Sequence, residues 1–212
     1  MCTYIYCVLS LLTGTRAVRA NISHLDSMFV SLRFATQQEL VKAGVSITSL
    51  LDTLYDLPTL KKAQHREFLV KYEKHFEDCK SIEGVFLKLN TYWNYLNFDI
   101  LAHFITKFSL RCLYSQLKAY EVEVGHFMER TTIQEYYKVE ADKQKIKPPE
   151  GFVELVSEHH WEAPINLKQV ENFRRMLARE YDLHECIVIL VSMGRGEGMG
   201  MATVEEEHLT SE

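Results

Sequence analysis

The chain has 212 residues, of which 47% are hydrophobic and 25% are charged, and its formal net charge is −5. This is the composition of a globular protein, and a chain of this length buries roughly 70% of its unfolded surface, so its core needs no disulfide or metal to hold it. The negative net charge argues against a broad nucleic-acid-binding surface.

Residues 1–24 contain a short apolar run, from Tyr4 to Leu12, which is too short to span a bilayer. The run has the length of a signal-peptide core, and Asn21-Ile22-Ser23 would then be a glycosylation sequon. However, no positive residue precedes the run, as a signal peptide requires. We expect residues 1–24 to be a leader or a poorly ordered N-terminus, and secretion stays an alternative.

Two helices are expected next. The first runs from Leu25 to Ala43 with Phe29, Leu32, Leu40 and Val41 as its apolar positions, and Gly44 is its C-terminal stop. The second follows Ser46 or Thr48, either of which can accept the hydrogen bonds of an N-cap. A charged helix from Leu60 to Cys79 comes after them, with its Lys and Glu residues on a solvated face.

The most apolar and aromatic stretch, Val85–Phe108, predicts two packed helices at the centre of a bundle over residues 25–142. The two stripes consist of Val85, Leu89, Tyr92 and Leu96, and of Ile100, Leu101, Phe104, Ile105 and Phe108. Asn97 lies between them and is expected to be the N-cap of the second helix. Tyr92, Trp93 and Tyr95 have two interpretations: buried core residues, which a helical stripe favours, or an exposed platform for a partner or for bases.

A heptad pattern follows, with apolar residues in alternating steps of three and four. Its members are Leu110, Leu113, Leu117, Tyr120, Val124 and Phe127. The pattern lasts fewer than three heptads, so it predicts a packed bundle helix and not a free coiled coil. Thr131 or Thr132 is expected to cap a last helix through Ile133 and Val139.

A lysine-rich segment with Pro148-Pro149, residues 143–151, predicts a linker. Beyond it, residues 152–204 predict a small β-α-β-β unit, whose helix is capped by Asn166 and has Leu167, Val170, Phe173 and Leu177 on its apolar face. Residues 205–212 are expected to be an acidic tail. The predicted fold class is mainly α, an N-terminal helical bundle followed by this small C-terminal unit (α+β).

A glycine-rich stretch, Gly194–Gly200, follows a predicted strand, where a phosphate-binding loop would begin. The dinucleotide fingerprint needs a third glycine five positions after the first, and Met199 and Met201 occupy those positions. We interpret the stretch as a hairpin turn, with phosphate binding as the alternative.

Histidines and cysteines form no convincing ligand set. His75 and Cys79 have a helical metal-ligand spacing without a second pair, and the adjacent His159 and His160 would point to opposite faces of an extended chain. His184 and Cys186 lack a visible activating third group. The five cysteines (Cys2, Cys7, Cys79, Cys112 and Cys186) are odd in number and unpaired in spacing, which is typical of a reducing compartment. We therefore expect cytoplasmic localisation.

Arg174, Arg175 and Arg179 lie along one predicted helix. A solvated face is the favoured interpretation, because the net charge is negative. The alternative is a site for phosphate or for an acidic partner.

Two segments resemble a known region. They are Tyr92-Trp93-Asn94-Tyr95-Leu96-Asn97 with Ile100-Leu101-Ala102-His103, and the later NLKQVENFRRMLAREYDLHECIVILVS. Both are similar to an uncharacterised helical-plus-α/β tandem region of invertebrate multidomain proteins that often carry death-fold, NACHT or ankyrin segments. The resemblance runs from Val41 to Val204 and implies an innate-immune or apoptosis-type signalling scaffold, without catalytic residues to carry over. The glycine-rich turn departs from the relatives, which have one glycine there, so the final hairpin is the least supported part.

From these observations we expect a non-enzymatic protein–protein interaction module, part of an adaptor in such a scaffold. Two alternatives stay open: an enzyme with a site assembled from dispersed residues such as His103, His126 and Cys112, or a weak nucleic-acid or phosphate binder through the Arg174–Arg179 helix. No catalytic, cofactor-binding or metal-ligating residue is assigned, and no cofactor or membrane span is expected. The protein partner, the oligomeric state and the pathway are not given by the sequence.

Overall fold

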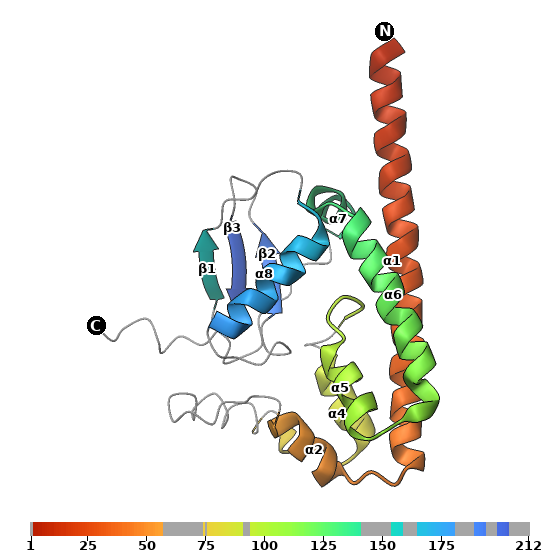
Figure 1. Ribbon diagram of the computed structural model, residues 1–212, viewed down its shortest axis with the longest axis vertical. Coiled ribbons are helices and arrows are strands. Elements are labelled where there is room, and N and C mark those ends of the chain that lie inside the picture. The colour runs from red at the N-terminus through yellow and green to blue at the C-terminus, as the bar shows by residue number, and fades with distance from the viewer. Residues whose placement is uncertain are drawn as a thin grey trace, which may run out of the picture.

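The structure is a computed structural model that describes residues 2–56, 74, 76–90, 94–140, 154–158, 165–180, 189–193 and 199–203 (Figure 1). Helices make up most of these residues, which confirms the mainly α fold class. Among the described residues, no helix is both long and apolar enough to cross a bilayer.

Helix α1 (Cys2–Lys42) forms one long edge of the molecule (Figure 1). It begins well before the expected start at Leu25, and Val18 and Ile22 are already buried in the core. At its other end Gly44 has a φ of 67°, and the amides of Gly44 and Val45 donate to the carbonyls of Val41 and Leu40. These two bonds form a Schellman motif, so the predicted stop at Gly44 is confirmed.

Two short helices follow. Ser46 caps α2 (Ile47–Asp56) by accepting a hydrogen bond from the Ser49 amide at 3.1 Å, as one of the two expected caps. Ser81 caps α4 (Ile82–Leu89) in the same way, through the Gly84 amide at 3.0 Å. The charged helix expected over Leu60–Cys79 lies mostly outside the described residues.

The central pair differs from its prediction at the junction. Helix α4 ends at Leu89 and does not continue to Leu96, and the N-cap of α5 (Asp99–Lys107) is Phe98, which makes no side-chain capping bond. The expected cap at Asn97 is therefore wrong. The Asn94 side chain instead accepts hydrogen bonds from the amides of Leu96 and Asn97 at 2.8 and 2.9 Å, which folds this segment into a turn before α5.

Helix α6 (Tyr114–Arg130) lies along α1 and follows a short 3₁₀ helix, η2 (Arg111–Leu113) (Figure 1). All six residues of the predicted heptad pattern are buried, so this pattern is confirmed as a packed seam. Tyr120 is fully buried, and its ring meets Phe98 edge-on at a centroid distance of 5.0 Å. The core of the bundle thus lies between α1, α6 and the α4–α5 pair.

The remaining elements are α7 (Ile133–Glu140), α8 (Leu167–Glu180) and three short strands. The strands β1 (Glu154–Glu158), β2 (Ile189–Met193) and β3 (Met199–Thr203) form an antiparallel sheet in the order β1-β3-β2. Helix α8 lies against α6, and its predicted apolar face is buried. The division into two domains, the linker over residues 143–151 and a separate α/β unit over residues 152–204 stay predictions.

Candidate functional site

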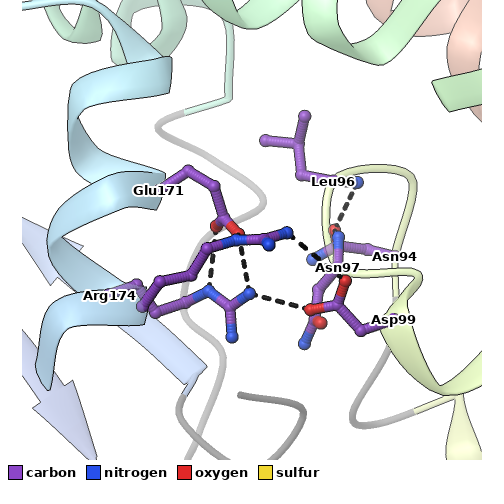
Figure 2. A network of polar contacts seen from close by, with 7 residues as sticks. Asn94, Leu96, Asn97, Asp99, Glu171 and Arg174 are labelled. Atoms are coloured by element: carbon purple, nitrogen blue, oxygen red, sulfur yellow. Dashed lines mark hydrogen bonds and ion pairs between the residues drawn. The ribbon is translucent and has the colours of Figure 1, made fainter. Parts of the chain in front are cut away.

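The arginines of α8 take part in a charged network with the start of α5 (Figure 2). Arg174 forms a bidentate pair with Glu171 on its own helix: Nε donates to Oε2 at 2.9 Å and Nη2 donates to Oε1 at 2.7 Å. The same Nη2 also donates to Oδ2 of Asp99 on α5, 75 positions away, at 2.8 Å. Arg175 adds a bond from its Nε to Glu171 Oε1 at 2.7 Å.

This network is largely shielded from water. The side chains of Arg174, Glu171 and Asp99 are 6%, 13% and 23% exposed, and that of Arg175 is 41% exposed. Burial alone would raise the pKa of Glu171, but the hydrogen bonds and charges of Arg174 and Arg175 outweigh burial and hold the pKa below its usual value. In the same way, burial opposes the charge of Arg174, and Glu171 and Asp99 together raise its pKa.

Asp99 is positioned for this role by its local structure. It is the first residue of α5, where the free amides and the helix dipole favour a carboxylate. The turn held by the Asn94 side chain directly precedes it, and a further bond from the Asn94 amide to the Asn97 carbonyl at 3.1 Å closes that turn. The turn and the helix start therefore fix the carboxylate that receives Arg174 (Figure 2).

Arg174 consequently does not lie on a solvated face, and the sequence interpretation is wrong for this residue. Its guanidinium already binds two carboxylates and is buried. Arg174 is therefore a poor candidate for binding a phosphate. Arg175 is half-buried and also bound to Glu171, and Arg179 is exposed. We interpret the network as a structural tie between α8 and α5.

The dispersed His and Cys residues of the enzyme alternative lie on three elements. His103 is half-buried on α5, His126 is exposed on α6, and Cys112 is exposed on η2. The Cys112 thiol donates to Glu39 Oε2 at 3.3 Å, and this hydrogen bond, together with the charge of Glu39, raises the pKa of the thiol. Cys112 is therefore less ready to act as a nucleophile than an ordinary thiol.

The other sequence candidates are mostly not described. Cys79 is half-buried, and burial raises the pKa of its thiol. The described residues contain no cluster of three His, Cys, Asp or Glu side chains that would hold a metal ion. The candidates outside the described residues are Cys186, His75, His159, His160 and His184, and most of the Gly194–Gly200 stretch.

Of the three aromatic residues Tyr92, Trp93 and Tyr95, the structure describes Tyr95. Tyr95 is buried, which confirms the core interpretation at that position, and its hydroxyl lies 3.1 Å from the hydroxyl of Tyr136 on α7. Tyr92 and Trp93 lie outside the described residues.

A feature that the sequence reasoning missed is a second apolar face on α1, which we call the α1 stripe. It consists of Val30, Phe34 and Val41, which are 45%, 59% and 61% exposed. Their spacing of four and seven residues places them within about 40° of one another around the helix. The predicted apolar positions Leu40 and Val41 are adjacent in the sequence, but Leu40 is fully buried whereas Val41 is exposed.

Comparison with known proteins identifies no relative: no family model, no curated protein and no solved structure matches this chain.

Proposed function

We propose that this protein is a non-enzymatic protein–protein interaction module and that the α1 stripe is its contact surface. The supporting observation is the arrangement of α1, which carries two apolar faces. One face, with Leu25, Leu32 and Leu40, is buried in the bundle, and the other, with Val30, Phe34 and Val41, is exposed. Fully burying a large apolar side chain contributes about 1.5–3 kcal/mol, and the bundle forgoes a large part of this contribution at three aligned positions.

The alignment is what gives these residues weight. Single exposed apolar side chains are common on protein surfaces and need no explanation. Three of them on one side of a helix form a ridge, and such a ridge packs into the groove of another helix. The stripe spans 11 positions, from residue 30 to residue 41, or about 16 Å along the axis.

We extend the proposal to the setting in which this contact is made. The resemblance of the Tyr92–His103 and Asn166–Ser192 segments supports a part in an innate-immune or apoptosis-type signalling scaffold. Cys79 and Cys112 are free thiols, which supports a reducing compartment such as the cytoplasm. The strands β1, β2 and β3 with α8 support a small C-terminal α/β unit beside the bundle.

Position-specific crosslinking tests the contact surface. A photoreactive amino acid replaces Phe34 in one variant and the exposed His24, about 80° from Phe34 around the same helix, in a control variant. In extract from the source cells, we expect a discrete protein adduct from position 34 and none from position 24. A Val41→Ser change in the first variant removes the adduct, because it breaks the stripe seven residues away.

Thermal unfolding separates this role from a structural one. Phe34→Ser and Val41→Ser are expected to keep the wild-type melting temperature, because both side chains already lie largely in water. A fall of several degrees in either variant, or equal adducts from positions 34 and 24, would overturn the proposed contact surface.

A further inference from the structure

The α1 stripe continues toward the N-terminus as a basic surface. Arg16 and Arg19 are exposed and lie 14 and 11 positions before Val30. At 100° per residue these two arginines and the three stripe residues fall within about 60° of one another around α1. One helix face therefore carries a basic segment at one end and an apolar segment at the other.

The two arginines are available to a partner. Within the described part of the chain, neither Arg16 nor Arg19 has a hydrogen bond or an ion pair from its side chain. Asp26, the nearest carboxylate on α1, lies about 20° outside this face. Its charge helps to raise the pKa of Tyr120 on α6.

We propose that this face docks an amphipathic helix of another protein, with acidic residues in its first turns and an apolar stripe behind them. The inference rests on the proposed function and adds the chemistry of the partner. The acidic turns complement Arg16 and Arg19, and the apolar positions pack on Val30, Phe34 and Val41. A parallel alignment follows, because acidic residues stabilise the N-terminal turn of the partner helix itself.

A membrane surface fits this face less well than a helix does. An interfacial helix buries a broad apolar face among the lipids. In α1 the broad apolar face is already buried in the bundle, and the exposed stripe is only about 40° wide. A narrow ridge of three side chains suits the groove of one partner helix.

Synthetic helices test the charge of the partner. The first peptide has about 25 residues, with glutamates in its first two turns and leucines at helical spacing after them. The second peptide carries glutamines in place of the glutamates. The third peptide has the glutamates in its last turns. Fluorescence anisotropy measures binding to the full chain at about 50 mM and about 300 mM salt. We expect the first peptide to bind at least about tenfold more tightly than the other two at low salt, and to lose this advantage at high salt.

Two sets of variants assign the contacts. The pair Arg16→Glu and Arg19→Glu is expected to weaken the glutamate peptide at least about tenfold and to leave the glutamine peptide unchanged. The matched control reverses the exposed Lys107 and Arg111, at the far end of α5 and in η2, and is expected to change neither. Phe34→Ser and Val41→Ser are each expected to weaken both peptides, and thermal melts establish that every variant is folded.

The outcomes separate this inference from the proposed function. Equal affinities for the glutamate and glutamine peptides would overturn the acidic partner. Failure of all three peptides to bind, while the crosslinked adduct at position 34 persists, would also overturn it. In both cases the proposed contact surface stands. Stronger binding to vesicles with roughly 30% phosphatidylserine than to the glutamate peptide, with the same sensitivity to Phe34→Ser, overturns the helix in favour of an anionic membrane.

Discussion

Thr132 and Asn166 pair with each other in an isolated antiparallel bridge, while each caps the helix that follows it. Thr132 accepts from the Glu135 amide, and Glu135 bonds back to the Thr132 amide at 3.0 Å. Asn166 and Gln169 exchange the same two bonds, each at 2.9 Å. Two capping boxes thus lie side by side and hold the N-termini of α7 and α8 together.

A proline at the first residue of α7 tests this junction. Proline is normally tolerated there, because the amide at that position has no partner within the helix. The Ile133 amide, however, donates to the Ile165 carbonyl at 3.0 Å across the bridge. We expect Ile133→Pro to lower the free energy of unfolding by about 1–3 kcal/mol more than Ile47→Pro, measured by denaturant titration.

Ile47 is a close control, because it is also a half-buried isoleucine at the first position of a helix capped by a hydroxyl side chain, that of Ser46. No bridge forms at its amide among the described backbone bonds. Equal losses in the two variants would show that the bridge between α7 and α8 adds nothing to stability.

The tie between Arg174 and Asp99 makes a second prediction. Arg174→Met keeps the bulk of the side chain but leaves two shielded carboxylates without their main partner, and removing one partner of a buried ion pair costs about 3–5 kcal/mol. We expect a loss near the low end, since Arg175 still binds Glu171. Arg175→Ala is expected to cost less than about 1 kcal/mol, because that side chain is 41% exposed.

Replacing the whole network separates charge from packing. If the loss in Arg174→Met comes from unpaired carboxylates, adding Asp99→Asn and Glu171→Gln restores part of the lost stability. A triple variant that is less stable than Arg174→Met would mean that the two carboxylates stabilise the protein through contacts other than Arg174, such as the start of α5, and that their lack of a partner is not the cause of the loss.

The pH dependence of stability reports on Glu171. Its pKa in the folded protein lies below the ordinary value of 4.5, so its contribution is present above that pH and is lost as the pH falls further. We expect Glu171→Gln to show a smaller drop in the free energy of unfolding between pH 5 and pH 3 than the wild type. Parallel pH profiles for the two proteins would contradict the lowered pKa.

Much of the fold was predictable because its signals are local. The seam from Leu110 to Phe127, the stop at Gly44 and the cap at Asn166 depend on residues within one or two turns of each other, and so do the caps at Ser46 and Thr132, each of which was one of two candidates. The turn before α5 was not predictable from the apolar spacing, which does not reveal that the Asn94 side chain accepts hydrogen bonds from the amides of Leu96 and Asn97 and so favours a turn over a helix there.

The candidate surfaces were not predictable for a different reason. The pairing of Arg174 with Asp99 joins residues 75 positions apart, and a charged residue on a helix looks the same in sequence whether water or a carboxylate faces it. Likewise, apolar residues at helical spacing form a stripe on either side of α1. Only the packing shows that Leu32 is buried and that Phe34 is exposed.

A matched pair of turns makes a further prediction. Ser109 follows the end of α5 with a φ of 53°, in the same Schellman arrangement as Gly44 after α1. The amides of Ser109 and Leu110 donate to the carbonyls of Thr106 and Ile105. A side chain in this left-handed conformation costs about 1 kcal/mol or somewhat more. We expect Ser109→Gly to raise the free energy of unfolding by about 0.5–1 kcal/mol, and Gly44→Ala to lower it by about 1 kcal/mol.

At Gly44 an added methyl group meets no atom within 4 Å, so the loss in Gly44→Ala isolates the backbone term. Chemical denaturation of both variants measures the two effects. A Ser109→Gly variant no more stable than the wild type would show that the serine is not strained at this position.

The last prediction concerns Tyr120, whose fully buried hydroxyl donates to the Tyr95 carbonyl at 2.5 Å. Tyr120→Phe keeps the ring contacts but leaves that carbonyl without this bond, so we expect a loss of about 1–3 kcal/mol in the free energy of unfolding. Tyr136→Phe, which removes the 3.1 Å contact between two hydroxyls, is expected to cost less.

Alkaline pH gives Tyr120 a second, independent signature. Burial, assisted by the charge of Asp26, raises its pKa above the ordinary value of 10.0. The folded state therefore favours the neutral phenol, and this contribution to stability is present below pH 10 and is lost as the pH rises above it. We expect the free energy of unfolding to fall less steeply between about pH 9.5 and pH 11 in Tyr120→Phe than in the wild type, because the variant has no phenol to ionise on unfolding. An equally steep fall in both proteins would contradict the raised pKa of Tyr120, because it would mean that this phenol ionises as readily in the folded bundle as in the unfolded chain.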